Sequence, residues 1–362
     1  LKRHRAQAAL PWGARPTMLG SMMGRLSGAA AAAPPERDVT LSVFMEGTAN
    51  PMDSVTTQIA LFSRLCEATP LAEKRSAAEA YSNAAEETYR RGHYKLSFPG
   101  CGVSNGLQGT IFATGLKEQC GVVRQHVLAF LDKQLTVTLN FVGLSRGGIG
   151  GLYLAQELSD LDIKQMVLNL LLFDPVPGNF IWMSTYLDLG GLMNANQTKD
   201  VSSVRNLGRV VVLYPHEPLP SIAVHAPLIA KFPEGCKLEE DVILGCHQGA
   251  LWFRPQADTC LAFARIRDFL LENGSSLSRG GRSAALDVSR NQLAEMLASE
   301  LSQNAPTTRC AHAAVHGTEI VRHPSGQFLN RYHQALLQRL GQRNEPDPQS
   351  DRPVYMLDIV VP

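Results

Sequence analysis

A serine held between two glycines is the residue of this chain with the clearest chemistry. The segment Gly143-Leu144-Ser145-Arg146-Gly147 has the spacing G-x-S-x-G. The apolar run 136–142 before it and the Ala/Leu/Gly-rich run 147–158 after it predict a strand, a tight turn and a helix. Such a turn strains the serine backbone and holds the hydroxyl above the strand end, and its glycines are needed because side chains there would collide. We therefore predict that Ser145 is a nucleophile; the alternative is an ordinary structural turn.

A serine hydroxyl is a weak nucleophile at neutral pH, so it needs a base that a carboxylate orients. Asp174 directly follows the predicted strand 165–173 and should reach the same edge of the sheet as Ser145. Glu217 follows the next predicted strand, 209–214, and remains open as the alternative acid. The structural alternative for Asp174 is a turn aspartate before proline.

His247 is the histidine best placed to be the base. It follows a short apolar run, 242–244, and small residues, Gly245 and Gly249, leave room around its ring. The order serine, acid, histidine is also the chain order of α/β-hydrolases. We predict His247 as the general base, with His225 in reserve and a structural histidine as the alternative.

The negative oxygen formed during acyl transfer needs preorganised donors. The backbone N–H of Arg146 is one candidate, and Gly47 or Thr48, in the loop after the predicted strand 39–45, is the second. An ordinary glycine turn is the alternative for that loop. Water completes this chemistry, so we expect no metal and no organic cofactor. The glycine-rich run 99–109 lacks the Lys-Ser/Thr ending of a P-loop, which argues against nucleotide binding.

The elements around these residues alternate between strands and helices. Three nearly continuous apolar runs, 136–142, 165–173 and 209–214, are typical of parallel strands buried on both faces. The helix at 147–158 between the first two predicts a crossover connection. The fold class is therefore α/β: an α/β-hydrolase with a doubly wound, mostly parallel sheet. Other predicted elements are strands at 39–45 and 94–98 and helices at 56–68, 115–131 and 261–272.

Three regions are expected along the chain. Residues 1–36 are basic and alanine-rich and predict a disordered leader, with an organelle transit peptide as the alternative and no secretory signal. Residues 37–275 form the catalytic domain, and 276–362 a helical C-terminal region with helices at 285–301 and 327–340. Within the domain, the aromatic and apolar segment 179–187 predicts either a cap over an apolar substrate pocket or a helix packed on the sheet.

Composition limits the partners. The 362 residues contain 34 basic and 33 acidic side chains, a formal net charge of +1, which does not indicate a nucleic-acid-binding protein. No apolar run reaches the roughly 18 residues of a transmembrane helix, so we expect at most peripheral membrane contact. The seven scattered cysteines, without a C-x-x-C pair, favour a reducing, cytoplasm-like compartment over a disulfide framework.

Five motifs in sequence resemble a known family. The resemblance is to the uncharacterised α/β-hydrolase family that includes type VI secretion phospholipase effectors, whose members show F-x-D-G-T-x-N, Y-x-x-G-V/C-G, G-F-S-R-G-A, D-T-V-G and G-x-H-S-D in this order. It implies a serine esterase in which Ser145 is the nucleophile, Asp174 and His247 are its partners, and Gly47 and Thr48 lie beside the serine. The matching segments are Val43–Asn50, Phe98–Gly102, Gly143–Gly148, Phe173–Val176 and Gly245–His247.

Three of the five motifs depart from the family pattern. Glu46 replaces the aspartate of the first motif, proline follows Asp174, and Gln248-Gly249 follows His247 in place of Ser-Asp. The expected activity is hydrolysis of carboxyl esters through an acyl-enzyme, with a lipid or phospholipid ester as substrate. The alternative is a catalytically inactive α/β-hydrolase scaffold that binds a ligand or a protein.

Overall fold

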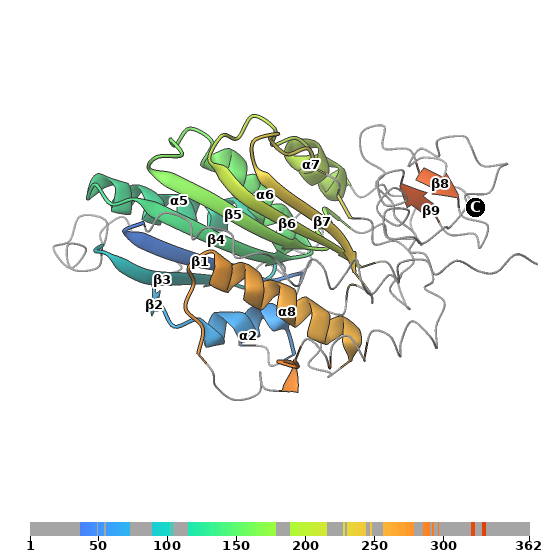
Figure 1. Ribbon diagram of the computed structural model, residues 1–362. Coiled ribbons are helices and arrows are strands. Elements are labelled where there is room, and N and C mark those ends of the chain that lie inside the picture. Colours follow the sequence, from blue (N-terminus) through green and yellow to red (C-terminus); the bar gives the residue numbers. More distant parts are fainter. Residues whose placement is uncertain are drawn as a thin grey trace, which may run out of the picture.

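Figure 1 shows the computed structural model of the chain. The leader 1–36, the predicted cap 179–187, Glu217 and His225 all lie outside the part of the chain that the structure describes. The described residues are 37–48, 50–53, 56–72, 89–101, 103, 115–178, 189–215, 227–228, 230–243, 247, 256–278, 285–289, 292, 296, 320–322 and 328–330.

The centre of the molecule is a seven-stranded sheet with the order β2-β3-β1-β4-β5-β6-β7, in which every pair of neighbours is parallel. All eight residues of β4 are buried, which explains its nearly continuous apolar sequence. The predicted doubly wound, mostly parallel sheet is confirmed. The strands are β1 (Val39–Met45), β2 (Thr69–Pro70), β3 (Gly92–Phe98), β4 (Val137–Leu144), β5 (Met166–Phe173), β6 (Leu207–Pro215) and β7 (Lys237–Ile243).

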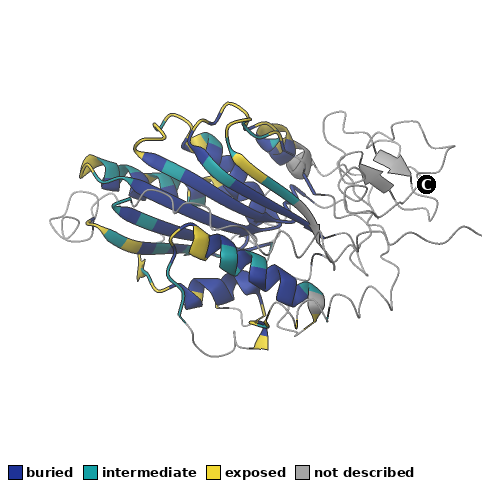
Figure 2. Cartoon of the chain, in the orientation of Figure 1, coloured by how far each residue is buried: buried dark blue, intermediate teal, exposed yellow. Residues whose placement is uncertain are grey.

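Helices cover both faces of the sheet (Figure 1). Alternate residues of one strand enter different layers of the core: Phe141 packs in the cluster that contains α5 and α6, and Val142 in the cluster that contains α2 and α8. Figure 2 shows the central strands β1, β4, β5 and β6 and the inward helix surfaces as mostly buried, whereas the outer strands carry exposed and intermediate residues. The helices are α2 (Gln58–Leu65), α5 (Leu116–Asp132), α6 (Arg146–Glu157), α7 (Leu189–Thr198), which packs against α6, and α8 (Ala257–Glu272).

The strand order changes direction between β1 and β4. From β1 the chain goes to the edge strand β2 and comes back to β3 beside β1, then crosses to the other side of β1 as β4 and continues outward to β7. In open α/β sheets the crevice at the carboxyl ends of the strands at such a switch point is the usual ligand site. The loops that leave β1 and β4 therefore flank the expected site.

Two predictions need correction. Val242 and Ile243 of the apolar run are only the end of a longer strand, since β7 begins at Lys237 and carries the acidic sequence Glu239–Asp241. In the C-terminal region, the helix expected at 327–340 is wrong at its start, because Phe328–Asn330 is strand β9, antiparallel to β8 (Ile320–Arg322). The β-branched and aromatic residues of these segments favour strands, and the Pro-Ser-Gly sequence between them is typical of turns.

None of the helices in the described part of the chain is long and apolar enough to span a membrane.

Candidate active site

Ser145 sits in the strained turn that its sequence predicts. It has φ 56° and ψ −119°, in a region that non-glycine residues rarely adopt, and it lies between the last residue of β4 and the first of α6. A Cβ on Gly147 would lie 2.2 Å from the carbonyl oxygen of Met45, and one on Gly143 would lie 2.5 Å from that of Gly147. Both glycines are thus required by close backbone approach, which is the geometry of a nucleophile elbow.

A parallel sheet in which a strained serine joins a central strand to the following helix is the defining feature of the α/β-hydrolase fold. The chain has an α/β-hydrolase fold.

Asp174 is held beside Ser145 through the backbone. The N–H of Ser145 donates to the carbonyl of Phe173 (2.9 Å), and the N–H of Val176 donates to the carbonyl of Ser145 (3.3 Å). Asp174 itself is completely buried, has φ 46° and donates its N–H to the carbonyl of Leu213 on β6 (2.9 Å). These bonds fix the carboxylate at the end of β5, on the same rim as the serine.

The imidazole of His247 meets this carboxylate. Nδ1 of His247 lies 2.5 Å from Oδ2 of Asp174, and both residues are buried. An ionised carboxylate can only accept a hydrogen bond, so this contact suits the imidazole tautomer that carries its proton on Nδ1. His247, which follows β7, is thus joined to Asp174, which follows β5. Asp174 in turn lies next to Ser145, which follows β4.

The loop after β1 lies against the first turn of α6. Nη1 of Arg146 donates to Oγ1 of Thr48 at 2.5 Å. Neither the backbone N–H of Thr48 nor that of Arg146 has a hydrogen-bond acceptor within the described residues. Gly47 closes a turn with its carbonyl, which accepts from the N–H of Asn50 (3.1 Å), and its own N–H interacts with the carboxyl of Glu46. Of the two loop donors expected from the sequence, Thr48 is therefore the one with an available N–H.

Glu46 is a buried acid that sequence reasoning did not single out as functional. Its Oε1 accepts from the hydroxyl of Thr57 and from the N–H of Ala60 (3.0 Å) at the N-terminus of α2, whereas its Oε2 is buried without a hydrogen bond. Burial raises the pKa of Glu46 to about 7, and hydrogen bonds from Thr57, Ala60 and Gly47 oppose that increase. The signal in the sequence was a glutamate directly after an apolar strand, where solvent exposure is not expected.

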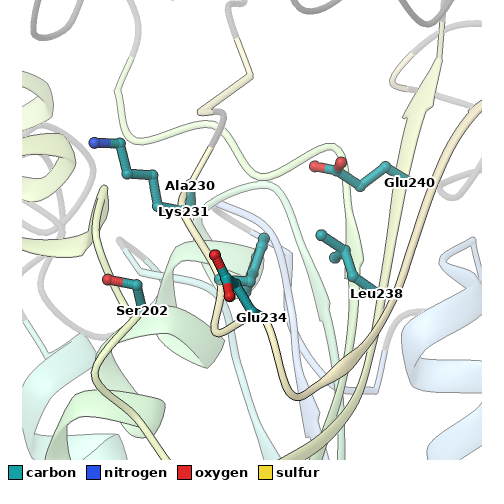
Figure 3. Close-up of a pocket in the computed structure, with 7 residues that line it drawn as sticks. Ser202, Ala230, Lys231, Glu234, Leu238 and Glu240 are labelled. Atoms are coloured by element: carbon teal, nitrogen blue, oxygen red, sulfur yellow. The ribbon is translucent and has the colours of Figure 1, made fainter.

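One pocket among the described residues lies away from Ser145, and it is not a metal site. Within the described ranges, no three His, Cys, Asp or Glu side chains are grouped so that they could hold a metal ion. An open pocket of about 670 Å³ lies toward the amino end of β7, and Figure 3 shows Ser202, Lys231 and Glu240 among the residues that line it. It contains neither Ser145 nor His247, so it does not belong to the site described above.

Comparison with known proteins gives structural likeness only. No protein-family model matches the chain, and a search of curated proteins finds no significant match. Among solved structures, an uncharacterised protein from Pseudomonas aeruginosa is similar over 80% of this chain and 53% of its own, at 14% identity and a TM-score of 0.48.

Two further solved structures are similar to this chain at lower TM-scores. The Tle1 effector bound to the VgrG spike of the type 6 secretion system aligns over 60% of this chain and 51% of its own, at 13% identity and a TM-score of 0.27. Est1E from Butyrivibrio proteoclasticus aligns over 66% and 89%, at 11% identity and a TM-score of 0.34. The chain spans about half the length of the first two proteins, and identity this low transfers no activity.

Proposed function

We propose that the protein is a serine hydrolase that cleaves carboxyl esters. The supporting observation is the hydrogen bond between His247 and Asp174 on the rim where the strained turn presents Ser145. A carboxylate that fixes one imidazole nitrogen orients the ring and stabilises its protonated form, which is what a serine nucleophile needs from its base.

The proposed reaction proceeds in two halves. Nε2 of His247 removes the proton from Ser145 as Oγ attacks the acyl carbon, and then gives that proton to the departing alcohol. Water, deprotonated by the same nitrogen, attacks the acyl carbon, and the nitrogen returns that proton to Oγ of Ser145 as the acid is released. In both halves the N–H groups of Arg146 and Thr48 would donate to the negative oxygen, and Asp174 would hold the imidazole.

For the substrate we propose a lipid or phospholipid ester. The support is the segment after Asp174, 179–187, whose sequence Asn-Phe-Ile-Trp-Met-Ser-Thr-Tyr-Leu is rich in aromatic and flexible apolar side chains. Such residues suit a pocket for an acyl chain. Rates measured on p-nitrophenyl esters from acetate to palmitate should rise with chain length, and a maximum at acetate would contradict a lipid substrate.

A fluorophosphonate probe tests the hydrolase itself, because it reacts covalently only with an activated serine. Wild type should be labelled, and Ser145→Ala should not be, although its circular dichroism is unchanged. His247→Ala should label far more slowly. A correctly folded wild type that stays unlabelled would refute the proposal and favour a scaffold that binds a ligand or protein without turnover.

A further inference from the structure

The side chain of Arg146 is a buried positive charge at the proposed nucleophile. Only 3% of the residue is exposed, although it directly follows Ser145. A guanidinium has five N–H donors. Within the described residues one bond uses them, from Nη1 to the hydroxyl of Thr48, and Nε is buried with no partner.

No carboxylate neutralises this charge within the described part of the chain, where Arg146 forms no ion pair. Two buried acids that follow strands of the same sheet are engaged elsewhere: Asp174 binds His247, and Glu46 binds the start of α2. The run 102–114, which follows β3 in the sequence, contains neither Asp nor Glu.

A buried charge without a counter-charge is costly, so a protein that keeps one usually gains something from it. The hydroxyl of Thr48, which accepts the hydrogen bond, is uncharged and therefore does not balance the positive charge of Arg146. The guanidinium also lies close enough to Cys101, in the loop after β3, to act on its thiol: burial raises the pKa of Cys101 and the charge of Arg146 opposes that increase. The positive charge therefore lies between the ends of β1, β3 and β4, at the switch point of the sheet.

We propose that the guanidinium of Arg146 is an anion subsite, which binds a phosphate or carboxylate group carried by the ester substrate close to its scissile carbonyl. This inference rests on the proposed function, because it names the substrate class of that site as anionic esters. Arginine suits the role since its planar donors match the oxygens of phosphate and carboxylate groups. The backbone N–H of Arg146 would then donate to the acyl oxygen, and its guanidinium would bind the charged group of the substrate.

Binding to Ser145→Ala protein tests the subsite without requiring turnover. Isothermal titration would compare octyl phosphate and octanoate with uncharged octanol. Octyl phosphate, octanoate or both should bind more tightly than octanol, and the stronger of the two identifies the source of the anion. Adding Arg146→Gln should weaken anion binding about 10- to 100-fold, as for a lost hydrogen bond to a charged group, without weakening octanol. Adding Arg146→Lys instead should preserve part of the preference.

Thr48→Val is the matched control, because it removes the partner hydroxyl and leaves the charge. If Arg146 only holds the loop, then Arg146→Gln and Thr48→Val will weaken all three ligands alike, and the anion subsite is refuted. Equal affinity of Ser145→Ala protein for octanol and both anions, or no binding of either anion, refutes it as well. Failure of the hydrolase proposal is recognised separately, as an unlabelled wild type that still binds the anions through Arg146.

Discussion

The buried carboxyl of Glu46 makes a stability prediction that depends on pH. Its pKa in the folded protein is about 7, against a usual value of 4.5, because burial disfavours the charged form. The folded state therefore holds the proton more tightly than the unfolded chain does. The stability linked to this proton is fully present below pH 4.5 and is lost as the pH rises to about 7.

The size of the effect follows from the two pKa values. Each tenfold change in proton affinity corresponds to 1.36 kcal/mol, so an increase in pKa from 4.5 to about 7 corresponds to roughly 3 kcal/mol of unfolding free energy. Glu46→Gln cannot ionise, and its amide oxygen can still accept from Thr57 and Ala60. Relative to wild type, Glu46→Gln should therefore gain about 3 kcal/mol between pH 4.5 and pH 8.

Urea denaturation of both proteins at half-unit pH intervals measures this difference. Comparing the two at each pH cancels all other titrating groups, since these are shared. The difference should rise with a midpoint between pH 4.5 and 7 and then become constant. A difference that stays flat across this range would show that Glu46 has its ordinary pKa and that its burial carries no electrostatic cost.

Two other substitutions test the acid and the elbow. Asp174→Asn should lower kcat for ester hydrolysis about 10⁴-fold, because the imidazole loses its orienting acceptor, whereas Glu217→Gln should retain activity; the reverse result in kinetic assays would make Glu217 the acid. Gly147→Ala places a Cβ 2.2 Å from a backbone oxygen and should lower the unfolding free energy by at least about 2 kcal/mol in urea. Gly121→Ala, in an open position on α5, should instead stabilise by about 0.5–1 kcal/mol, and equal effects of the two changes would contradict the close approach.

Buried strands were the part of the fold that sequence predicted best. The apolar runs of β4 and β5 are explained by burial on both faces, and their expected bounds differ from the observed ones by at most two residues. The sequence did not predict the first part of the edge strand β7, because most of its residues there are charged. Its Glu239 pairs with Arg209 on β6 and Arg265 on α8, so an acidic residue occupies a strand position through ion pairs that its own sequence does not reveal.

The candidate site also has one part that the sequence predicts and one part that it leaves open. The turn at Ser145 is local, so its spacing of glycines predicts it, whereas the choice between Asp174 and Glu217 depends on where an imidazole from beyond β7 arrives. The hydrogen bond from His247 favours Asp174. The left-handed backbone of Asp174, φ 46°, could not be expected from a residue before proline, although aspartate is among the residues that tolerate it.

The loop from Glu46 to Asn50 is held from several sides, which bears on how the proposed oxyanion site works. Glu46 joins it to α2, Thr48 joins it to Arg146, and the N–H of Gly100 donates to the carbonyl of Asn50 (2.9 Å). Preorganised donors lower a barrier because they need no rearrangement as charge develops. A loop fixed by two buried side chains, those of Glu46 and Arg146, keeps its N–H in place before substrate arrives. Glu46 would then fix the position of the loop, and Arg146 would bind the charged group of the substrate. Variants of Glu46 should therefore change kcat, whereas variants of Arg146 should change the preference for anionic esters.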